Sequence, residues 1–397
     1  MHAPEVIDGE PAEQRAQSGL RTRQLLIALI RETAPVTRSD LTRLSGLSRS
    51  AVAAAVQRLV DDGLVTESAL SPTGRGRPAS LLRPRVPDGT LVGIDFGHDH
   101  VALAVADAHG QVLAERREQL EVDAHSAEAL DAAVRLFDSE LLTAGVDRSA
   151  VRAVVAAIPG PLDVRSGRVQ SATILSSWVD MAPAELLSER LQCPVQLGND
   201  AELGALGELS FGAGRGIADL LYVKASHGIG AGLVLGGRLY QGASGIAGEI
   251  GHTQIDGGGD QCRCGQRGCL EAMVSASVVR RRLQVSGFEV AESAGGLAEV
   301  ALDPVGARVI SEAGRHLGRV VADICNCLNP ARVVLGGQLG AAGEPFAAGV
   351  RESVARYAQP AISAAVEIRP AELGLRAELM GTLARGMQIA AGWTGGR

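Results

Sequence analysis

A cluster of three cysteines and one histidine most constrains how this chain can fold. It lies in the stretch GEIGHTQIDGGGDQCRCGQRGCLEA at residues 248–272. The candidate metal ligands are His252, Cys262, Cys264 and Cys269. Three thiolates and one imidazole suit a tetrahedral zinc ion, and Gly265 and Gly268 allow the tight bends that aim the sulfurs inward. We expect one zinc ion per chain, with a structural role, because the protein would fill all four ligand positions.

The rest of the chain indicates a cytoplasmic protein. No apolar run reaches the roughly 18 residues that a membrane helix needs. The first twenty residues are polar and lack the apolar core of a signal peptide. Thiols stay reduced in the cytoplasm, so clustered cysteines there indicate a metal more than disulfides. The remaining cysteines, Cys193, Cys325 and Cys327, are expected to be core residues.

Charge is distributed unevenly along the chain. The net charge is −7, but residues 20–85 contain eleven Arg against five Asp or Glu, which leaves about −13 on the remainder. This asymmetry favours a basic nucleic-acid module joined to an acidic body, although an Arg-rich composition and chance could also produce it. Residues 1–19 are polar and without periodicity, and we expect them to form a disordered tail.

The basic segment begins with two expected helices. Apolar residues at helical spacing predict the first over residues 20–32. Ser39 is expected to cap a short second helix that carries Leu41 and Leu44 on its buried side. Gly46 is expected to end that helix.

A third helix and a hairpin complete the pattern. Ser48 is expected to cap a helix over residues 49–62. Its inward side chains are expected to be Val52, Val56, Leu59 and Val60. Strands are expected over residues 64–69 and 80–85. Together these elements predict a winged helix-turn-helix at residues 20–86, whereas the alternative is a generic three-helix bundle with a hairpin.

The exposed face of the third helix fits the major groove of DNA. Arg and Gln side chains read base edges, and Ser hydroxyls at a helix N-terminus hold phosphates. The loop between the strands, SPTGRGRP, has a narrow basic tip suited to the minor groove. The predicted DNA-binding residues are Arg38, Ser48, Arg49, Ser50, Ala53, Gln57, Arg75 and Arg77. A solvated basic loop is the alternative for the tip alone.

Beyond a linker near residue 87, the chain alternates strands and helices. The stretch LLYVKASHGIGAGLVLGGRLYQG repeats the order of strands and turns in residues 91–115. This internal echo predicts two similar α/β lobes.

Three motifs carry a resemblance to a known family: GNDAELGALGE at 198–208, GEIGH at 248–252 and CRCGQRGCLE at 262–271. On these motifs the body resembles the ROK family, named for repressors, open reading frames and kinases. The resemblance implies an α/β fold, in which an N-terminal winged helix-turn-helix joins a two-lobed actin/hexokinase-like (ribonuclease H-like) body. The winged helix makes the chain similar to the family's transcriptional regulators rather than to its sugar kinases.

The resemblance also implies boundaries and site residues. The ROK domain would span residues 90–397. Lobe 1 would comprise residues 90–198 with a C-terminal helix at 381–397, and lobe 2 would comprise residues 199–380, including the zinc motif 252–269. The family's sugar site would map onto Asn199, Asp200, Glu249, His252 and Glu271. Asp200 matches the catalytic base of the kinases.

The chemistry of these residues agrees with that assignment. Carboxylates and an amide bind the paired hydroxyls of a sugar. Glu249 and His252 lie three positions apart, on one face of any helical turn. If one ring nitrogen of His252 binds zinc, the other can face the ligand in a fixed tautomer.

Both phosphate-binding turns depart from the pattern of the family's kinases. The first should read Asp-x-Gly-Gly-Thr, but here it runs DFGHDH from Asp95. The second should read Gly-Thr-Gly-Ile-Gly, but here it reads SHGIG from Ser226. A carboxylate would repel ATP phosphates, and bulky side chains would obstruct the close approach of the backbone. We therefore do not expect an enzyme.

The sequence thus predicts a DNA-binding transcriptional regulator, most simply a repressor, with a sugar or sugar derivative as effector. We expect a homodimer or tetramer on a near-palindromic operator in double-stranded DNA. An active sugar kinase with an added DNA-binding domain is the alternative. A third possibility is a body that binds no sugar and acts as a platform for dimerisation and protein docking.

Overall fold

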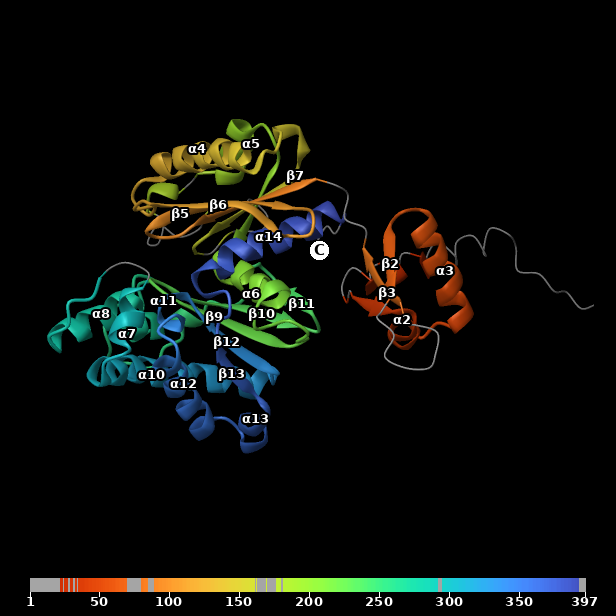
Figure 1. Ribbon diagram of the computed structural model, residues 1–397. Coiled ribbons are helices and arrows are strands. Elements are labelled where there is room, and N and C mark those ends of the chain that lie inside the picture. The colour runs from red at the N-terminus through yellow and green to blue at the C-terminus, as the bar shows by residue number, and fades with distance from the viewer. Residues whose placement is uncertain are drawn as a thin grey trace, which may run out of the picture. The chain divides into compact units, whose positions relative to one another are not determined.

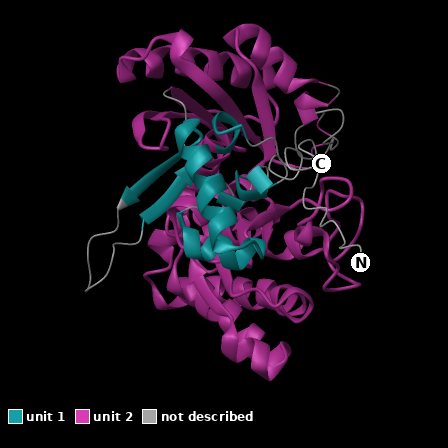
Figure 2. Cartoon of the chain, turned by 90° about the vertical axis from the view of Figure 1, so that its right-hand side faces the viewer, with its two compact units in different colours: residues 1–87, 388–397 teal, residues 88–387 magenta. Residues whose placement is uncertain are grey.

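The computed structural model describes residues 22–23, 25–27, 29–30, 33, 35–69, 80–84, 89–160, 162, 169, 176–179, 181–291 and 295–392. The chain forms two compact units, residues 1–87 with 388–397 and residues 88–387 (Figure 2). The expected tail at 1–19 and the basic loop tip, with Arg75 and Arg77, lie outside the described residues. No helix in the described part of the chain has the length and apolarity to cross a bilayer.

The N-terminal unit is a three-stranded sheet packed with helices. Its named elements are β1 (Val36–Thr37), α2 (Arg38–Ser45), α3 (Arg49–Asp61), β2 (Val65–Ala69) and β3 (Ser80–Pro84). The strand order is β1-β3-β2, with β3 antiparallel to both neighbours. The described part of the expected first helix is helical, and its Leu26 and Ile30 are buried in the core of this unit.

Two details of α2 differ from expectation. The helix is capped by Thr37 rather than Ser39, because Thr37 and Asp40 form a reciprocal capping box: the Thr37 hydroxyl accepts from the Asp40 N–H, and the Asp40 carboxylate accepts from the Thr37 N–H. Leu41 is fully buried, but Leu44 is 43% exposed. Leu44 lies about 60° around the helix axis from Leu41.

The start of α3 was predicted correctly. Ser48 caps the helix by accepting a hydrogen bond from the N–H of Ala51. Gly46, at φ 69°, ends the preceding helix in the left-handed conformation expected of it. The buried face of α3 carries Val52, Val56 and Leu59, as predicted, and also Ala55.

Lobe 1 of the body is a five-stranded mixed sheet in the order β6-β5-β4-β7-β8. Its strands are β4 (Thr90–Phe96), β5 (His100–Asp107), β6 (Val112–Gln119), β7 (Val151–Ile158) and β8 (Val195–Asn199). The first three form an antiparallel meander, and β7 and β8 continue in parallel. Helices α4 (Ser126–Ala144) and α5 (Pro183–Leu191) cover one face (Figure 1). The 3-10 turns of this lobe are η1 (Arg148–Ala150) and η2 (Ser176–Trp178).

Lobe 2 repeats this topology in the order β11-β10-β9-β12-β13, so the predicted pair of similar lobes is confirmed. Its strands are β9 (Leu220–Ala225), β10 (Ile229–Leu235), β11 (Arg238–Tyr240), β12 (Arg332–Gly336) and β13 (Glu367–Pro370). Its helices and 3-10 turns are η3 (Ile250–His252), α7 (Leu270–Val274), α8 (Ala276–Val285), α9 (Gly296–Val300), α10 (Pro304–Leu328), α11 (Gly337–Gly340), α12 (Glu344–Tyr357), α13 (Pro360–Ala365) and η4 (Gly374–Arg376).

Two helices, α6 (Asp200–Phe211) and α14 (Ala377–Ala390), lie between the sheets (Figure 1). They cross closely, since a Cβ at Gly381 would stand 1.7 Å from the carbonyl oxygen of Leu203. A Cβ at Gly93 on β4 would likewise meet Thr382. These glycines therefore bring the start of α6, where Asp200 lies, between the two sheets. The C-terminal helix begins at Ala377, four residues before the predicted start.

Candidate functional site

The predicted metal ligands converge in the structure. The ligand atoms of the four residues all lie within 4.8 Å of one another. The 3-10 turn η3 carries His252, and the loop that follows returns to place Cys269 directly before α7. This return requires glycine at position 268. The residue has φ 68°, and a Cβ added there would stand 1.4 Å from the Asp256 carbonyl oxygen.

The spacing of these atoms matches a zinc ion. Two sulfurs each bound to zinc at tetrahedral angles should be about 3.8 Å apart, and a sulfur and an imidazole nitrogen about 3.6 Å. The Cys264 and Cys269 sulfurs are 3.7 Å apart, and Cys262 Sγ is 3.6 Å from His252 Nδ1. The cluster is therefore a plausible structural metal site, with Nδ1 as the histidine ligand.

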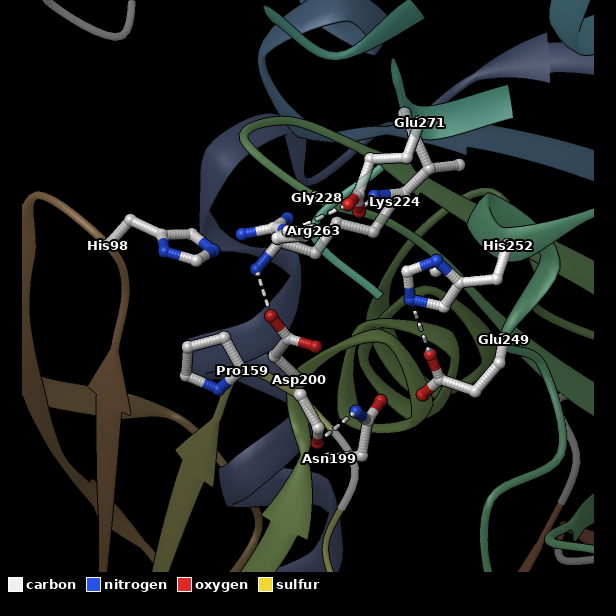
Figure 3. Close-up of a pocket in the computed structure, with 13 residues that line it drawn as sticks. His98, Pro159, Asn199, Asp200, Lys224, Gly228, Glu249, His252, Arg263 and Glu271 are labelled. Carbon is white, nitrogen blue, oxygen red and sulfur yellow. Dashed lines mark hydrogen bonds and ion pairs between the residues drawn. The ribbon is translucent and has the colours of Figure 1, made fainter. Parts of the chain in front are cut away.

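A pocket lined largely by polar side chains lies between the lobes, beside this cluster (Figure 3). The structure brings all five sugar-site candidates to it. The lining comprises His98, Pro159, Gly160, Asn199, Asp200, Lys224, Gly228, Ile229, Gly230, Glu249, His252, Arg263 and Glu271. Lobe 1 contributes the loop after β4, the residues directly after β7, and Asn199 at the end of β8. Asp200 comes from the start of α6, and lobe 2 contributes the remaining wall from β9 onward.

Asp200 is bound by a buried lysine at the base of this pocket. Lys224 Nζ donates to Asp200 Oδ2 at 2.7 Å and lies 3.7 Å from the Glu378 carboxylate on α14. Burial lowers the pKa of Lys224, but the carboxylates of Asp200, Glu378 and Asp95 raise it by more, so the net pKa is raised. Lys224 is therefore charged at neutral pH. It holds the residue that matches the kinase base in a tight ion pair.

Two other pocket residues are fixed by hydrogen bonds. Asn199 is the N-cap of α6: its Oδ1 accepts from the Glu202 N–H, and its Nδ2 donates to the Gly160 carbonyl. Glu271 accepts from Arg263 Nε at 2.6 Å and from the Ile229 N–H at 3.0 Å. These contacts orient the polar atoms before any ligand arrives, which lowers the entropic cost of binding.

Glu249 differs from its neighbours because, among the described residues, no lysine or arginine forms an ion pair with it. Burial, followed by the charges of Asp200 and Glu271, raises the pKa of Glu249 to about 7. Its Oε2 is 3.8 Å from His252 Nε2, so the second ring nitrogen of His252 faces the pocket side. Near neutral pH the Glu249 carboxyl can therefore donate or accept a hydrogen bond.

Lys224, Arg263 and His98 line the pocket but were missed from the sequence. Lys224 is the only lysine in the chain and lies two residues before the second glycine-rich turn, which was an available signal. Arg263 lies between two predicted zinc ligands, so any ordered cluster must place it nearby. His98 was noted only as a departure from a phosphate-binding loop.

The two altered glycine-rich turns, residues 95–100 of lobe 1 and 226–230 of lobe 2, lie opposite each other. His98 Nδ1 is 2.8 Å from both oxygens of Asp123, and its ring lies 5.2 Å from that of His227. In the first turn Asp99 contacts His100 Nδ1 at 2.7 Å, and His100 Nε2 contacts Asp95 at 3.0 Å. Imidazole rings and carboxylates thus occupy the space around these turns.

In the N-terminal unit, the start of α3 presents an exposed surface. Ser48, Arg49, Ser50, Ala53 and Gln57 are all exposed. Gln57 Nε2 donates to Asp61 within the helix. Arg38 forms a paired hydrogen bond with the Glu67 carboxylate, at 2.8 and 2.9 Å, so its guanidinium is already engaged by protein.

Comparison with known proteins identifies both parts of the chain. Residues 91–386 match the model of the ROK family, and residues 18–76 match that of the MarR family. A xylose repressor from Caldicellulosiruptor bescii is 27% identical over 91% of this chain and 94% of its own length.

Solved structures with a similar fold include a transcriptional regulator and a glucokinase of the ROK family. A ROK family transcriptional regulator, described as a homologue of the E. coli Mlc protein, shares the fold with a TM-score of 0.71 and 24% identity, over 94% of this chain and 98% of its own. A ROK family glucokinase from Streptomyces griseus, in complex with glucose and AMPPNP, matches with a TM-score of 0.65 and 26% identity, over 76% of this chain and all of its own. The chain is thus similar to a xylose repressor over 91% of its length and to a glucokinase over 76% of it.

Proposed function

The chain belongs to the ROK family, and from this premise we propose that it is a transcriptional repressor whose body binds a sugar or sugar derivative as effector. The observation that carries this proposal is the combination, in one chain, of a MarR-type winged helix-turn-helix with a body that keeps a preorganised polar pocket. We also propose that His252, Cys262, Cys264 and Cys269 hold one structural zinc, which fixes the wall of that pocket.

The proposed mechanism uses closure of the two lobes around the effector. Pocket residues come from both lobes, so a bound sugar would favour one lobe arrangement over another. A ligand shifts such an equilibrium only by the difference in its affinity for the two arrangements. In a dimer or tetramer, this shift would change the spacing of paired winged helices against two halves of a near-palindromic operator.

An active sugar kinase is the rival function, and the residues around Asp200 argue against it. A general base must be free to take the proton from the attacking hydroxyl, but Asp200 is paired with Lys224 at 2.7 Å. His98 and His227 also place imidazole rings, 5.2 Å apart, at the turns that would hold ATP phosphates. We expect no turnover in a coupled assay with ATP and a panel of hexoses. Turnover of roughly 1–100 per second, the usual range of kinases, would favour the rival.

The DNA-binding function is tested by Arg49→Ala. Arg49 is exposed in the first turn of α3, where a recognition helix contacts base edges. Losing one such contact should weaken operator binding by about 1–3 kcal/mol, or roughly 5- to 150-fold. Binding is measured by fluorescence anisotropy on an operator selected from random DNA by the wild-type protein.

The matched control is Arg58→Ala. Arg58 is exposed in the last turn of the same helix, where its side chain donates to the Ala54 carbonyl. Its removal deletes the same charge away from the expected base contacts, so specific binding should change little. Equal losses for the two variants would mean that Arg49 contributes only charge and that the recognition surface lies elsewhere.

A further inference from the structure

A second pocket adjoins the proposed effector pocket. The two share a wall formed by His98, Arg263 and Glu271, which Figure 3 shows beside Asp200 and Lys224. The far side of the second pocket is formed by His227, by Ser275 and by Ser277 on α8. A ligand seated against Glu271 therefore has a second, separate space immediately beyond the Arg263 side chain.

The charges around these pockets disfavour an anionic ligand. Among the described residues that line them, the permanently cationic side chains are Lys224 and Arg263. Each is already paired with a carboxylate, Lys224 with Asp200 and Arg263 with Glu271. The second pocket adds the carboxylate of Asp123. A phosphate would lose its hydration here and gain no unpaired cation in return.

The remaining polar groups suit hydroxyls. Asp123 accepts from Nδ1 of His98, which leaves Nε2 of that ring for a ligand. Burial, and then the neighbouring His98, lower the pKa of His227 to about 4, so its imidazole is neutral and can both donate and accept. The hydroxyls of Ser275 and Ser277 lie 3.1 Å apart and offer the same dual capacity. Such groups match the alternating hydroxyls and ring oxygen of a sugar.

We propose that the second pocket is a binding subsite for a second sugar ring or another uncharged polar group, so that the effector is a neutral disaccharide or glycoside rather than a monosaccharide or a sugar phosphate. One unit would occupy the pocket of Glu249 and Glu271. The attached unit would pass Arg263 and bind between His227 and Ser277. This inference rests on the proposed sugar-effector function and specifies its ligand class.

Isothermal titration calorimetry on the full chain tests the proposal with matched probes. Glucose is compared with cellobiose and maltose, xylose with xylobiose, and N-acetylglucosamine with chitobiose. Glucose 6-phosphate and ATP serve as anionic probes. We expect at least one disaccharide to bind about tenfold or more tighter than its own monosaccharide, a difference of about 1.4 kcal/mol. Neither anionic probe should bind more tightly than the neutral sugars.

His227→Ala should reduce that disaccharide's affinity to the level of the monosaccharide, while affinity for the monosaccharide stays unchanged. His109→Ala, an identical substitution at an exposed turn, should change neither affinity. If His227→Ala does not fold, Ser277→Ala on the exposed start of α8 provides the same comparison with a smaller loss.

Three outcomes would count against the inference. A monosaccharide that binds as tightly as its dimer would overturn it while leaving the proposed sugar effector in place. Tighter binding of glucose 6-phosphate or ATP would overturn it in favour of an anion site. Absence of binding by every sugar would reject the proposed sugar effector, and this inference with it.

Discussion

Cys269→Ser is expected to lower bound zinc from about one ion per chain to near zero. Cys269 is fully buried, and its sulfur lies 3.7 Å from that of Cys264, so a serine hydroxyl would replace one of the four proposed ligands. Because ligand geometry in this loop depends on the ion, the free energy of unfolding should fall by several kcal/mol. Metal content is measured by plasma emission spectrometry and stability by denaturant unfolding.

The same variant tests the link between the metal and the effector pocket. His252 and Glu271 line the pocket, and they flank the loop that carries the cysteines. We therefore expect Cys269→Ser to lose sugar binding together with zinc. Metal-free protein that still bound the effector with full affinity would contradict this coupling.

Cys327→Ser is the matched control. Cys327 was expected in the core, but it is exposed near the end of α10, and it is not among the four clustered ligands. It should keep its zinc, its stability and its sugar binding. Zinc lost equally from both variants would indicate a general effect of cysteine replacement instead of the loss of a specific ligand.

Patterns that are local in the sequence predicted most of the fold. Apolar strands joined by glycine-rich turns recur at residues 91–115 and 220–241, and each becomes a three-stranded antiparallel meander in a sheet with the same strand order. The metal cluster was predictable for the same reason. Cysteine and histidine are rare residues, and the four ligands fall within one short stretch of chain. Predicting the cluster therefore required no knowledge of contacts between distant segments.

Predictions that depended on a choice between neighbouring residues were less successful. Ser39 and Thr37 are both good N-caps, but only Thr37 has an acidic residue three positions later to complete a capping box. Arg38 stays a predicted DNA-binding residue, but its pairing with Glu67, 29 positions away, was not foreseen. The sequence shows how many charges a segment carries. It does not show which acidic side chain a flexible arginine pairs with after folding.

The largest omission, Lys224, arises from contacts between distant segments. Its partners Asp200, Glu378 and Asp95 come from α6, α14 and β4. Their convergence depends on the close helix crossing at Gly381, which no local pattern reveals. As a consequence, the Lys224 ammonium group neutralises carboxylates from both lobes and from the C-terminal helix.

Lys224→Met should be strongly destabilising. The variant keeps much of the side-chain volume but leaves Asp200 and Glu378 buried without their cation, at side-chain exposures of 10% and 5%. Removing one partner of a buried ion pair typically costs about 3–5 kcal/mol, because the remaining charge is neither hydrated nor paired. Urea unfolding at pH 7.5 measures the loss. Arg308→Met, which deletes one cation from an exposed position, should change stability little.

Glu378→Gln provides a second test of this ion pair. Its effect on stability should change sign between the wild type and the Lys224→Met variant. In the wild type it removes a carboxylate near Lys224 and should destabilise the body. In Lys224→Met it relieves repulsion between Glu378 and Asp200, so the double variant should be more stable than Lys224→Met alone by roughly 1 kcal/mol. Gln can still accept the hydrogen bond that Tyr222 donates to Glu378. If Glu378→Gln lowered stability equally in the wild type and in Lys224→Met, it would contradict the hypothesis that Lys224 holds these two carboxylates together.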